Sequence, residues 1–166
     1  HRRRRRGDLR VTVDAPVTGH RGRRVMDRPS FDALEVGQEV FEAAKVVKRE
    51  DVKAYADASG DQNPLHQDDE FARSVGFPGI IAHGMFSMAH VTKAVKDWAG
   101  NPAALRSLSV QFRAVVYMDE TLVARGKVAA TDAASGDVTL DVWAEVERDG
   151  QRVLVIKNAR ALVNLG

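Results

Sequence analysis

The sequence places an acid and a base close together in the stretch SGDQNPLH, residues 59–66. Asp61 precedes His66 by five positions, and on a helix this separation leaves two side chains apart around the axis. Pro64 also disfavours helical geometry for the residue before it, Asn63. The stretch is therefore predicted to be a loop that aims each polar group individually, and such loops often carry the chemistry of a protein.

An aspartate and a histidine around one water molecule can act as general acid and base. Imidazole titrates near neutral pH, and a nearby carboxylate can fix its tautomer or share its proton. A second motif, IIAHGM at residues 80–85, lies where a loop enters a long predicted helix. The backbone N–H groups at that helix start, with Gly84 admitting a close approach, could polarise a carbonyl group. These parts suit water addition to, or elimination from, a carbon activated by a carbonyl.

Each of these polar residues also has an ordinary structural role. Asp61 and Asn63 commonly hold turns through their side chains. His66, taken alone, could be a satisfied interior or surface histidine. His83, within IIAHGM, is expected to brace its loop by bonding a backbone carbonyl. The residues themselves leave the structural and the catalytic roles open.

No metal and no cofactor are predicted. Outside the first 25 residues the histidines are His66, His83 and His90, and they show no paired spacing typical of metal ligands. His90 is expected to be a packing or surface residue in the middle of a helix. Met85 and Met88 are expected to belong to the hydrophobic core rather than to contact a cofactor.

Length and composition indicate one domain. The chain has 166 residues, of which 44% are apolar, and this is enough for a sizeable core. The sequence contains no cysteine, which excludes disulfides, thiolate metal sites and cysteine nucleophiles. No apolar run approaches the roughly 20 residues that span a bilayer. A cytoplasmic location without membrane association is therefore predicted.

The positive charge of the chain is concentrated in residues 1–25. This segment holds nine arginines and two aspartates, whereas the remaining residues hold 16 basic and 21 acidic side chains. The segment is predicted to be a disordered basic arm or a mis-assigned start ahead of Met26. Nucleic-acid binding by the arm is the alternative, and it is not favoured because no aromatic residue or motif accompanies the arginines. The folded domain is predicted to span residues 26–166.

Hydrophobic periodicity predicts helices and strands in a definite order. A first strand at 39–47 precedes a helix at 49–58 and a short helix at 68–74, which offers Phe71 and Val75 to the core. A long helix follows within 79–100, and because little of its surface is polar it should be enclosed. Four β-rich segments with hairpin-type turns at 119–120, 135–137 and 149–150 are predicted to form an antiparallel meander; they cover 105–118, 122–131, 138–146 and 152–163.

The loop and helix motifs together resemble a known family. The stretch YADASGDQNPLH, residues 55–66, followed by Ala72, closely resembles the signature of the MaoC-like (R)-specific enoyl-thioester hydratases, and IIAHGM resembles a second block of that family. The resemblance extends over 31–163, and only Ala58 departs slightly from the pattern. The chain is also similar to the catalytic subunits of actinobacterial (3R)-hydroxyacyl-acyl carrier protein dehydratases.

This resemblance implies an α+β hot dog fold, in which an antiparallel sheet wraps around a long central helix. It implies that Asp61 and His66 activate a water molecule and that the Gly84 amide binds the thioester carbonyl. Asn63 would help to hold the loop and the water. The implied reaction is hydration of a trans-2-enoyl thioester, or dehydration of a (3R)-hydroxyacyl thioester, with no cofactor and no metal.

The resemblance also implies partners and substrate contacts. Coenzyme A or acyl carrier protein thioesters would be the substrates, with His83, Met85 and Ser87 contacting them. A homodimer, or a heterodimer with a second hot dog subunit, is expected. The alternatives are a hot dog acyl-thioesterase and a non-catalytic partner subunit of a heterodimeric dehydratase. The signature argues against the first of these, and the presence of both Asp61 and His66 argues against the second.

Overall fold

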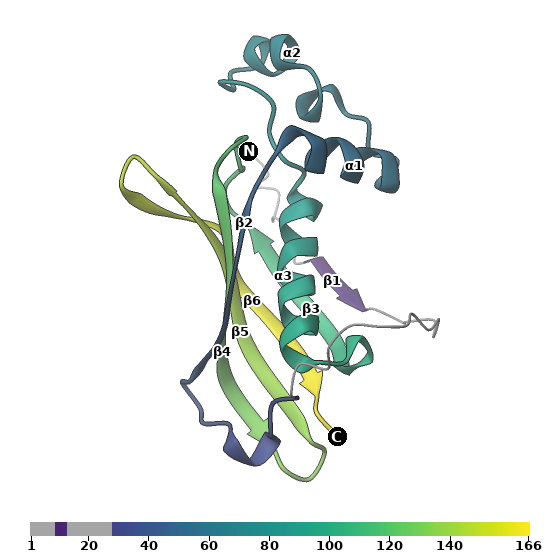
Figure 1. The fold of residues 1–166 in the computed structure, drawn as a ribbon, viewed down its shortest axis with the longest axis vertical. Helices are drawn as coiled ribbons and strands as arrows, with labels where there is room; N and C mark the ends of the chain where they lie inside the picture. Colours follow the sequence, from purple (N-terminus) through teal and green to yellow (C-terminus); the bar gives the residue numbers. More distant parts are fainter. Residues whose placement is uncertain (1–8, 13–27) are drawn as a thin grey trace, which may run out of the picture.

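The computed structural model describes residues 9–12 and 28–166, which form one antiparallel sheet with helices against it (Figure 1). The strand order in the sheet is β1-β3-β6-β5-β4-β2. The strands are β1 (Leu9–Thr12), β2 (Glu39–Val46), β3 (Leu105–Phe112), β4 (Thr121–Asp132), β5 (Asp137–Arg148) and β6 (Gln151–Asn164). The helices are α1 (Arg49–Ser59), α2 (Asp69–Ser74) and α3 (Gly84–Ala99), and the 3₁₀ turns are η1 (Phe31–Ala33), η2 (Pro64–His66) and η3 (Pro102–Ala104).

The core lies between α3 and one face of the sheet. Every second residue is buried in the first eight residues of β4 and the first ten of β5, as expected for strands that turn one face toward a core. Val91 and Val95 of α3 are fully buried and belong to the same cluster as Leu122 and Leu140 of the strands. Figure 1 shows α3 running along the sheet, as the predicted enclosure of this helix requires.

Most of the predicted elements are confirmed with small shifts at their ends. The strand expected at 39–47, the helix at 49–58 and the long helix from Gly84 onward are β2, α1 and α3. The connections from β4 to β5 and from β5 to β6 are the predicted hairpins. At the second of these, Asp149 and Gly150 both have positive φ, 53° and 71°, which is the backbone that a tight Asp-Gly hairpin turn requires.

The predicted hairpin at 119–120 is wrong. β3 pairs with β6 and β1 rather than with β4, and it ends at Phe112 instead of continuing to 118. The backbone groups of the segment after β3 instead form hydrogen bonds with the loop before α3 and with the residue that follows β2. Ala82 N–H donates to Val116 O at 2.9 Å, and Asp119 N–H donates to Val47 O at 2.8 Å. The apolar residues of this segment indicated a strand, but the segment pairs with these two loops instead of with β4.

The prediction that α2 offers Phe71 and Val75 to the core is also wrong. These side chains are 40% and 52% exposed, and Ala72 is the buried residue of this helix. Figure 1 shows the reason, because α2 lies at the end of the molecule beyond the sheet. The main contacts of α2 are with η2.

Four residues of the arginine-rich segment form β1, which pairs with β3 from Leu9 to Thr12. No strand was predicted there, and the rest of the predicted arm at 1–25 lies outside the described residues. Over 9–12 and 28–166, the search for membrane spans finds no helix with the length and apolar character needed to cross a bilayer.

Gly126 of β4 provides a test of the sheet packing. It pairs with Phe41 of β2, and a Cβ at this position would lie 2.4 Å from Cε1 of the Phe41 ring. We expect Gly126→Ala to lower the free energy of unfolding by about 1–3 kcal/mol, because the ring has to move out of a packed position. Urea denaturation measures this difference. The same substitution in a Phe41→Leu background should be less damaging, and an equal loss in both backgrounds would contradict the contact.

Candidate active site

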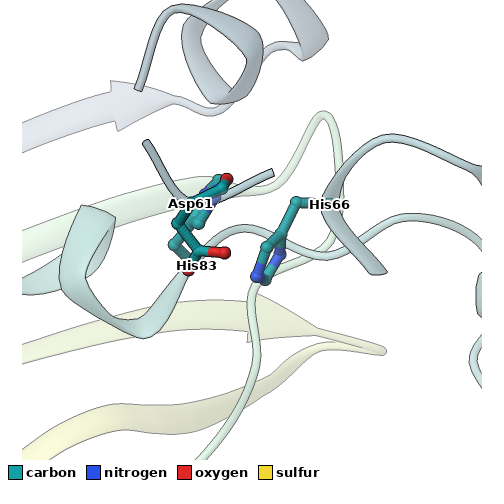
Figure 2. Close-up of side chains that lie close together, drawn as sticks. All are labelled: Asp61, His66 and His83. Atoms are coloured by element: carbon teal, nitrogen blue, oxygen red, sulfur yellow. The ribbon is translucent and has the colours of Figure 1, made fainter. Parts of the chain in front are cut away.

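Three chain segments bring Asp61, His66 and His83 together at one end of α3 (Figure 2). Asp61 follows α1, which ends at Gly60 in the left-handed conformation with φ 76°. His66 is the last residue of η2, the turn in which Pro64 occupies the first helical position. His83 is the N-cap residue of α3. The two predicted catalytic side chains therefore share one site, and His83 joins them.

The three side chains are close and differ in exposure. One nitrogen or oxygen atom from each lies within 4.8 Å of the others. The His66 and His83 rings stack with their centroids 3.7 Å apart and their planes 28° apart. His83 is only 2% exposed, His66 is partly buried and Asp61 is exposed. The site thus has a buried side formed by the histidines and an open side formed by the carboxylate.

Hydrogen bonds to backbone carbonyls fix the tautomers of both histidines. His66 Nδ1 lies 2.7 Å from Ile81 O, and His83 Nε2 lies 3.1 Å from the backbone O of Asp61. A carbonyl oxygen only accepts, so each of these ring nitrogens carries the proton. In the neutral form of a ring, the lone pair is then on Nε2 for His66 and on Nδ1 for His83. The predicted bracing bond of His83 is confirmed.

The turn roles of Asp61 and Asn63 are present as well. Asp61 Oδ1 accepts a hydrogen bond from Asn63 N–H at 3.2 Å, and Asn63 Oδ1 accepts one from Leu65 N–H at 3.0 Å. Ser59 Oγ accepts from Asp61 N–H at 3.2 Å. These local bonds hold the loop that carries the carboxylate, so the structural role and a position in the site are compatible for both residues.

The second loop, from Ile80 into α3, is fixed through its backbone. Ile81 N–H donates to Leu65 O at 3.1 Å, so the residue whose carbonyl accepts from His66 also binds the η2 turn. Ile80 N–H donates to Asp69 Oδ1 at 2.9 Å, and Arg49 forms an ion pair with the other oxygen of Asp69 at 2.6 Å. The loop is therefore tied to both α1 and α2.

A clamp of Arg148 and Glu120 supports this loop from the sheet. Arg148 donates two hydrogen bonds to the Glu120 carboxylate, at 2.7 and 2.9 Å, and one to Val115 O at 3.1 Å. Its guanidinium also lies over the Tyr117 ring, 4.4 Å from the centroid. Tyr117 pairs with Ile81 in an isolated β-bridge. The sequence analysis missed this clamp, because nothing local connects a glutamate and an arginine 28 positions apart.

The predicted substrate-contacting residues on α3 differ in exposure. Gly84 is the first residue of α3, where a backbone N–H has no partner within the helix. Met85 is 42% exposed, so the prediction that it belongs to the core is wrong: it lies on the first turn of α3 and is open to solvent. Met88 is 4% exposed, and for this residue the core prediction is confirmed. Ser87 is 2% exposed, one turn below the site.

Tyr55 is a site residue that the sequence analysis did not single out. Its ring lies 4.9 Å from the His83 ring and 5.9 Å from the Phe86 ring, the latter in an edge-to-face arrangement. Burial raises the pKa of the Tyr55 hydroxyl, and the charge of Asp61 acts in the same direction. Its position at the start of the YADASGDQNPLH stretch was the available signal.

A largely apolar groove lies along α3. Its volume is about 440 Å³, and its lining includes Tyr55, Met85, Met88, Ala89, Lys93 and Leu108. The Tyr55 ring that lines this groove also lies 4.9 Å from the His83 ring. The groove therefore adjoins the polar site through Tyr55.

Burial dominates the electrostatics of His66. It lowers the pKa of the ring, and the neighbouring His83 acts in the same direction. The hydrogen bond to Ile81 and the charge of Asp61 act in the opposite direction but do not outweigh burial. At neutral pH the His66 ring is therefore neutral, with its Nε2 lone pair available to accept a proton.

Comparisons with known proteins identify related sequences. The family described as "MaoC like domain" matches residues 32–148. The chain is 38% identical over 91 residues to the mitochondrial 3-hydroxyacyl-[acyl-carrier-protein] dehydratase of Arabidopsis thaliana, a match that covers 54% of this chain and 53% of the relative. It is 42% identical over 67 residues to the peroxisomal enoyl-CoA hydratase 2 of Arabidopsis thaliana, covering 39% of this chain and 22% of the relative. The chain thus spans about half or less of these relatives.

A comparison of structures identifies the fold. The (R)-hydratase from A. caviae involved in PHA biosynthesis superposes with a TM-score of 0.72 at 26% identity, over 81% of this chain and 98% of that one. The architecture of one antiparallel sheet with a long helix against it is the hot dog fold, in the α+β class. The fold implied by the resemblance of the two motifs is confirmed.

The histidines predict how stability depends on pH. Burial lowers the pKa of His66 and, as the largest cause, also that of His90 on α3. A ring whose folded pKa lies below its unfolded value, about 6.5, binds protons more weakly when folded. The contribution of these two histidines to the free energy of unfolding should therefore be fully present above about pH 6.5. It should decrease as the pH drops from there toward the folded pKa values.

Proton NMR titration and thermal melts between about pH 7 and pH 5 test this expectation. Both rings should titrate below about 6.5, and His90→Gln should reduce the loss of melting temperature on acidification. A His66 midpoint above that value would contradict burial as the dominant cause.

Proposed function

Since this chain belongs to the MaoC-like domain family, we propose that it catalyses the (R)-specific hydration of trans-2-enoyl thioesters and the reverse dehydration of (3R)-hydroxyacyl thioesters in fatty-acid metabolism. The observation that carries the proposal is that Asp61 lies in one cluster with His66, whose Nδ1 proton is bound by Ile81 O so that Nε2 is left unprotonated. The names of the similar proteins, a hydroxyacyl-acyl-carrier-protein dehydratase and an enoyl-CoA hydratase, agree with it.

In the proposed reaction a water molecule lies between Asp61 and His66. His66 Nε2 accepts a proton from the water while the water oxygen bonds to C3 of the enoyl thioester. The electron pair of the C2–C3 double bond moves to C2, which receives a proton through the same Asp61–His66 pair. The sum is the addition of one water molecule, and both proton-handling groups act from one face of the substrate.

The thioester carbonyl is proposed to bind at the start of α3. There the Gly84 N–H is free of an intrahelical partner, and a Cβ at this position would already contact the Phe112 ring at 3.4 Å. A hydrogen bond from this amide stabilises the negative charge that develops on the carbonyl oxygen. Asn63 contributes by holding the loop of Asp61, and His83 by bracing the same loop.

The acyl chain is proposed to follow the groove beside α3. Met85 is exposed and lines this groove, so we propose that its side chain contacts the first carbons of the acyl chain. Ser87 is buried in the first turn of α3. We propose that it contacts the substrate from the buried side of the site, together with His83. Both coenzyme A and acyl carrier protein fit the proposal as carriers of the thioester.

Partner and location are part of the same proposal. A homodimer, or a heterodimer with a second hot dog subunit, would cover the apolar surface that Met85 and Ala89 expose on α3. A cytoplasmic location is supported by the absence of cysteine from the sequence.

Substitution of the paired groups tests the catalytic assignment. Asp61→Asn and His66→Gln should each lower the rate of crotonyl-coenzyme A hydration by about 10²–10⁴-fold, because each variant removes a proton-handling group. The loss of absorbance of the enoyl thioester measures this rate, and circular dichroism checks the fold.

Two matched variants control for the substitutions. Asp132→Asn changes an aspartate that also holds a turn, accepting from Ala134 N–H at 2.9 Å. His90→Gln changes a histidine that also bonds a carbonyl, Ala43 O at 2.9 Å. Both should keep near-normal rates, whereas a normal rate in Asp61→Asn or His66→Gln would show that the residue is not catalytic.

The likeness to an (R)-hydratase predicts the configuration of the product. Hydration should give the (3R)-hydroxyacyl product, which an (R)-specific reductase running in reverse consumes and an (S)-specific dehydrogenase does not. A thiol reagent in a parallel assay detects release of free coenzyme A. Rapid thiol release without hydration would identify a thioesterase instead, and mainly (S) product would refute the (R)-specific assignment.

A further inference from the structure

The N–H groups of three consecutive residues hold the loop that enters α3. Each donates to a different segment of the chain: Ile80 to Asp69 Oδ1 at 2.9 Å, Ile81 to Leu65 O at 3.1 Å and Ala82 to Val116 O at 2.9 Å. Two of these three acceptors are backbone carbonyls, which every residue type provides. The third is the side chain of Asp69, so this is the bond of the three that a substitution removes directly.

Asp69 joins three segments around the site. It is the first residue of α2, and the main contacts of α2 are with η2, the turn that ends at His66. Its other carboxylate oxygen forms an ion pair with Arg49, the first residue of α1, at 2.6 Å. The hydrogen bond from Ile80 N–H, followed by the one from Arg49, holds the pKa of the Asp69 carboxyl below its usual range. The acceptor is therefore a charged group, and charged acceptors form stronger hydrogen bonds than neutral ones.

We propose that Asp69 is a positioning residue for His66: its bond to Ile80 N–H holds the loop so that the Ile81 carbonyl binds the Nδ1 proton of His66. The Ile80 N–H and the Ile81 carbonyl belong to adjacent residues, so a shift of the loop at Ile80 displaces this carbonyl. Asp69 has no contact with the reacting atoms in the proposed reaction. Its effect on the rate passes through His66.

The position of the Ile81 carbonyl decides the tautomer of His66 as well as its orientation. Which nitrogen of a neutral histidine carries the proton is set by the hydrogen bonds that the ring makes. Without a well-placed acceptor for Nδ1–H, the ring also adopts the Nε2–H tautomer, which free histidine favours in water. In that form Nε2 has no lone pair to accept a proton from the attacking water. Loss of the Asp69 bond therefore lowers the fraction of the protein that has a working base.

NMR of the full chain without substrate tests the structural part of the proposal. Nitrogen-15 spectra of ring-labelled histidine distinguish a protonated from an unprotonated ring nitrogen. At a pH where the ring is neutral, we expect His66 of the wild type to be protonated at Nδ1 alone. Asp69→Ala should show a mixture of both tautomers. A His66 spectrum that is unchanged in Asp69→Ala would overturn the proposal.

The kinetic part rests on the proposed function and uses the hydration of crotonyl-coenzyme A. Asp69→Ala should lower kcat by about 10–100-fold, because a misplacement of about 1 Å caused far from the reacting atoms costs this much. Since Asp69 does not contact the substrate, KM should change by less than about twofold. A rise in KM with an unchanged kcat would contradict a role through His66.

Two conservative variants separate the length of the Asp69 side chain from its charge. Asp69→Asn keeps an oxygen at the right distance to accept from Ile80 N–H but loses the charge that attracts Arg49. Asp69→Glu keeps the charge and moves the carboxylate outward by one methylene group. We expect Asn to restore more of kcat and of the Nδ1–H tautomer than Glu does. The reverse order would overturn the proposal, and this comparison decides it even if Asp69→Ala fails to fold.

Asp68→Ala is the matched control. Asp68 is the N-cap residue of α2 and accepts hydrogen bonds from Glu70 N–H at 2.9 Å and Phe71 N–H at 3.0 Å. Its removal weakens α2 without removing a bond to the loop that enters α3. Asp68→Ala should therefore lower the melting temperature while kcat and the His66 tautomer stay close to those of the wild type. An equal loss of kcat in Asp68→Ala and Asp69→Ala would show that α2 acts only as a structural support, which would overturn the proposal.

The two measurements separate a failure of this inference from a failure of the proposed function. If the chain hydrates no enoyl thioester but Asp69→Ala still shifts the His66 tautomer, the proposed function fails while the positioning role of Asp69 stands. If hydration is fast and Asp69→Ala leaves the tautomer and kcat unchanged, the positioning role is refuted while the proposed function stands.

Discussion

The candidate site depends on the backbone of one residue, Ile81. Its N–H donates to Leu65 O, and its carbonyl accepts the Nδ1 proton of His66. This pair of bonds joins the loop after α1 to the loop that enters α3, and it sets the tautomer of the histidine. The position of His66 relative to Gly84 thus follows from a backbone pairing rather than from side-chain packing.

The sheet holds that backbone in place from the other side. Ala82 N–H binds Val116 O, and the neighbouring Val115 O accepts from Arg148, which also forms the two-bond ion pair with Glu120. Arg148 is the last residue of β5, so the clamp links the centre of the sheet to the loop. Such a two-pronged pair is stronger and better oriented than an ordinary surface ion pair. The position of the loop that carries Ile81 therefore depends on contacts made by the central strands.

The parts that could be predicted from the sequence are those set by local chemistry. Pro64 and Asn63 determine the η2 turn through bonds within the turn itself. Helical and alternating apolar patterns identify the helices and the β4–β6 meander. The pairing of β3 with β6 and the Arg148–Glu120 clamp depend on which distant segments meet, and no local pattern encodes this. The exposure of Phe71 and Met85 was missed for the same reason, since an apolar residue on a helix face indicates burial only if another element covers that face.

The bonds that hold the two loops also decide which atom of His66 is left unprotonated. A general base needs a fixed tautomer with an unprotonated nitrogen, and a second proton-handling group nearby. The Ile81 carbonyl binds the Nδ1 proton of His66 and leaves Nε2 unprotonated, while Asp61 belongs to the same close cluster. His83 holds this arrangement from the buried side, because its Nε2–H binds the backbone carbonyl of Asp61 and its ring stacks on that of His66. The same backbone bonds therefore fix both the position and the tautomer of the proposed base.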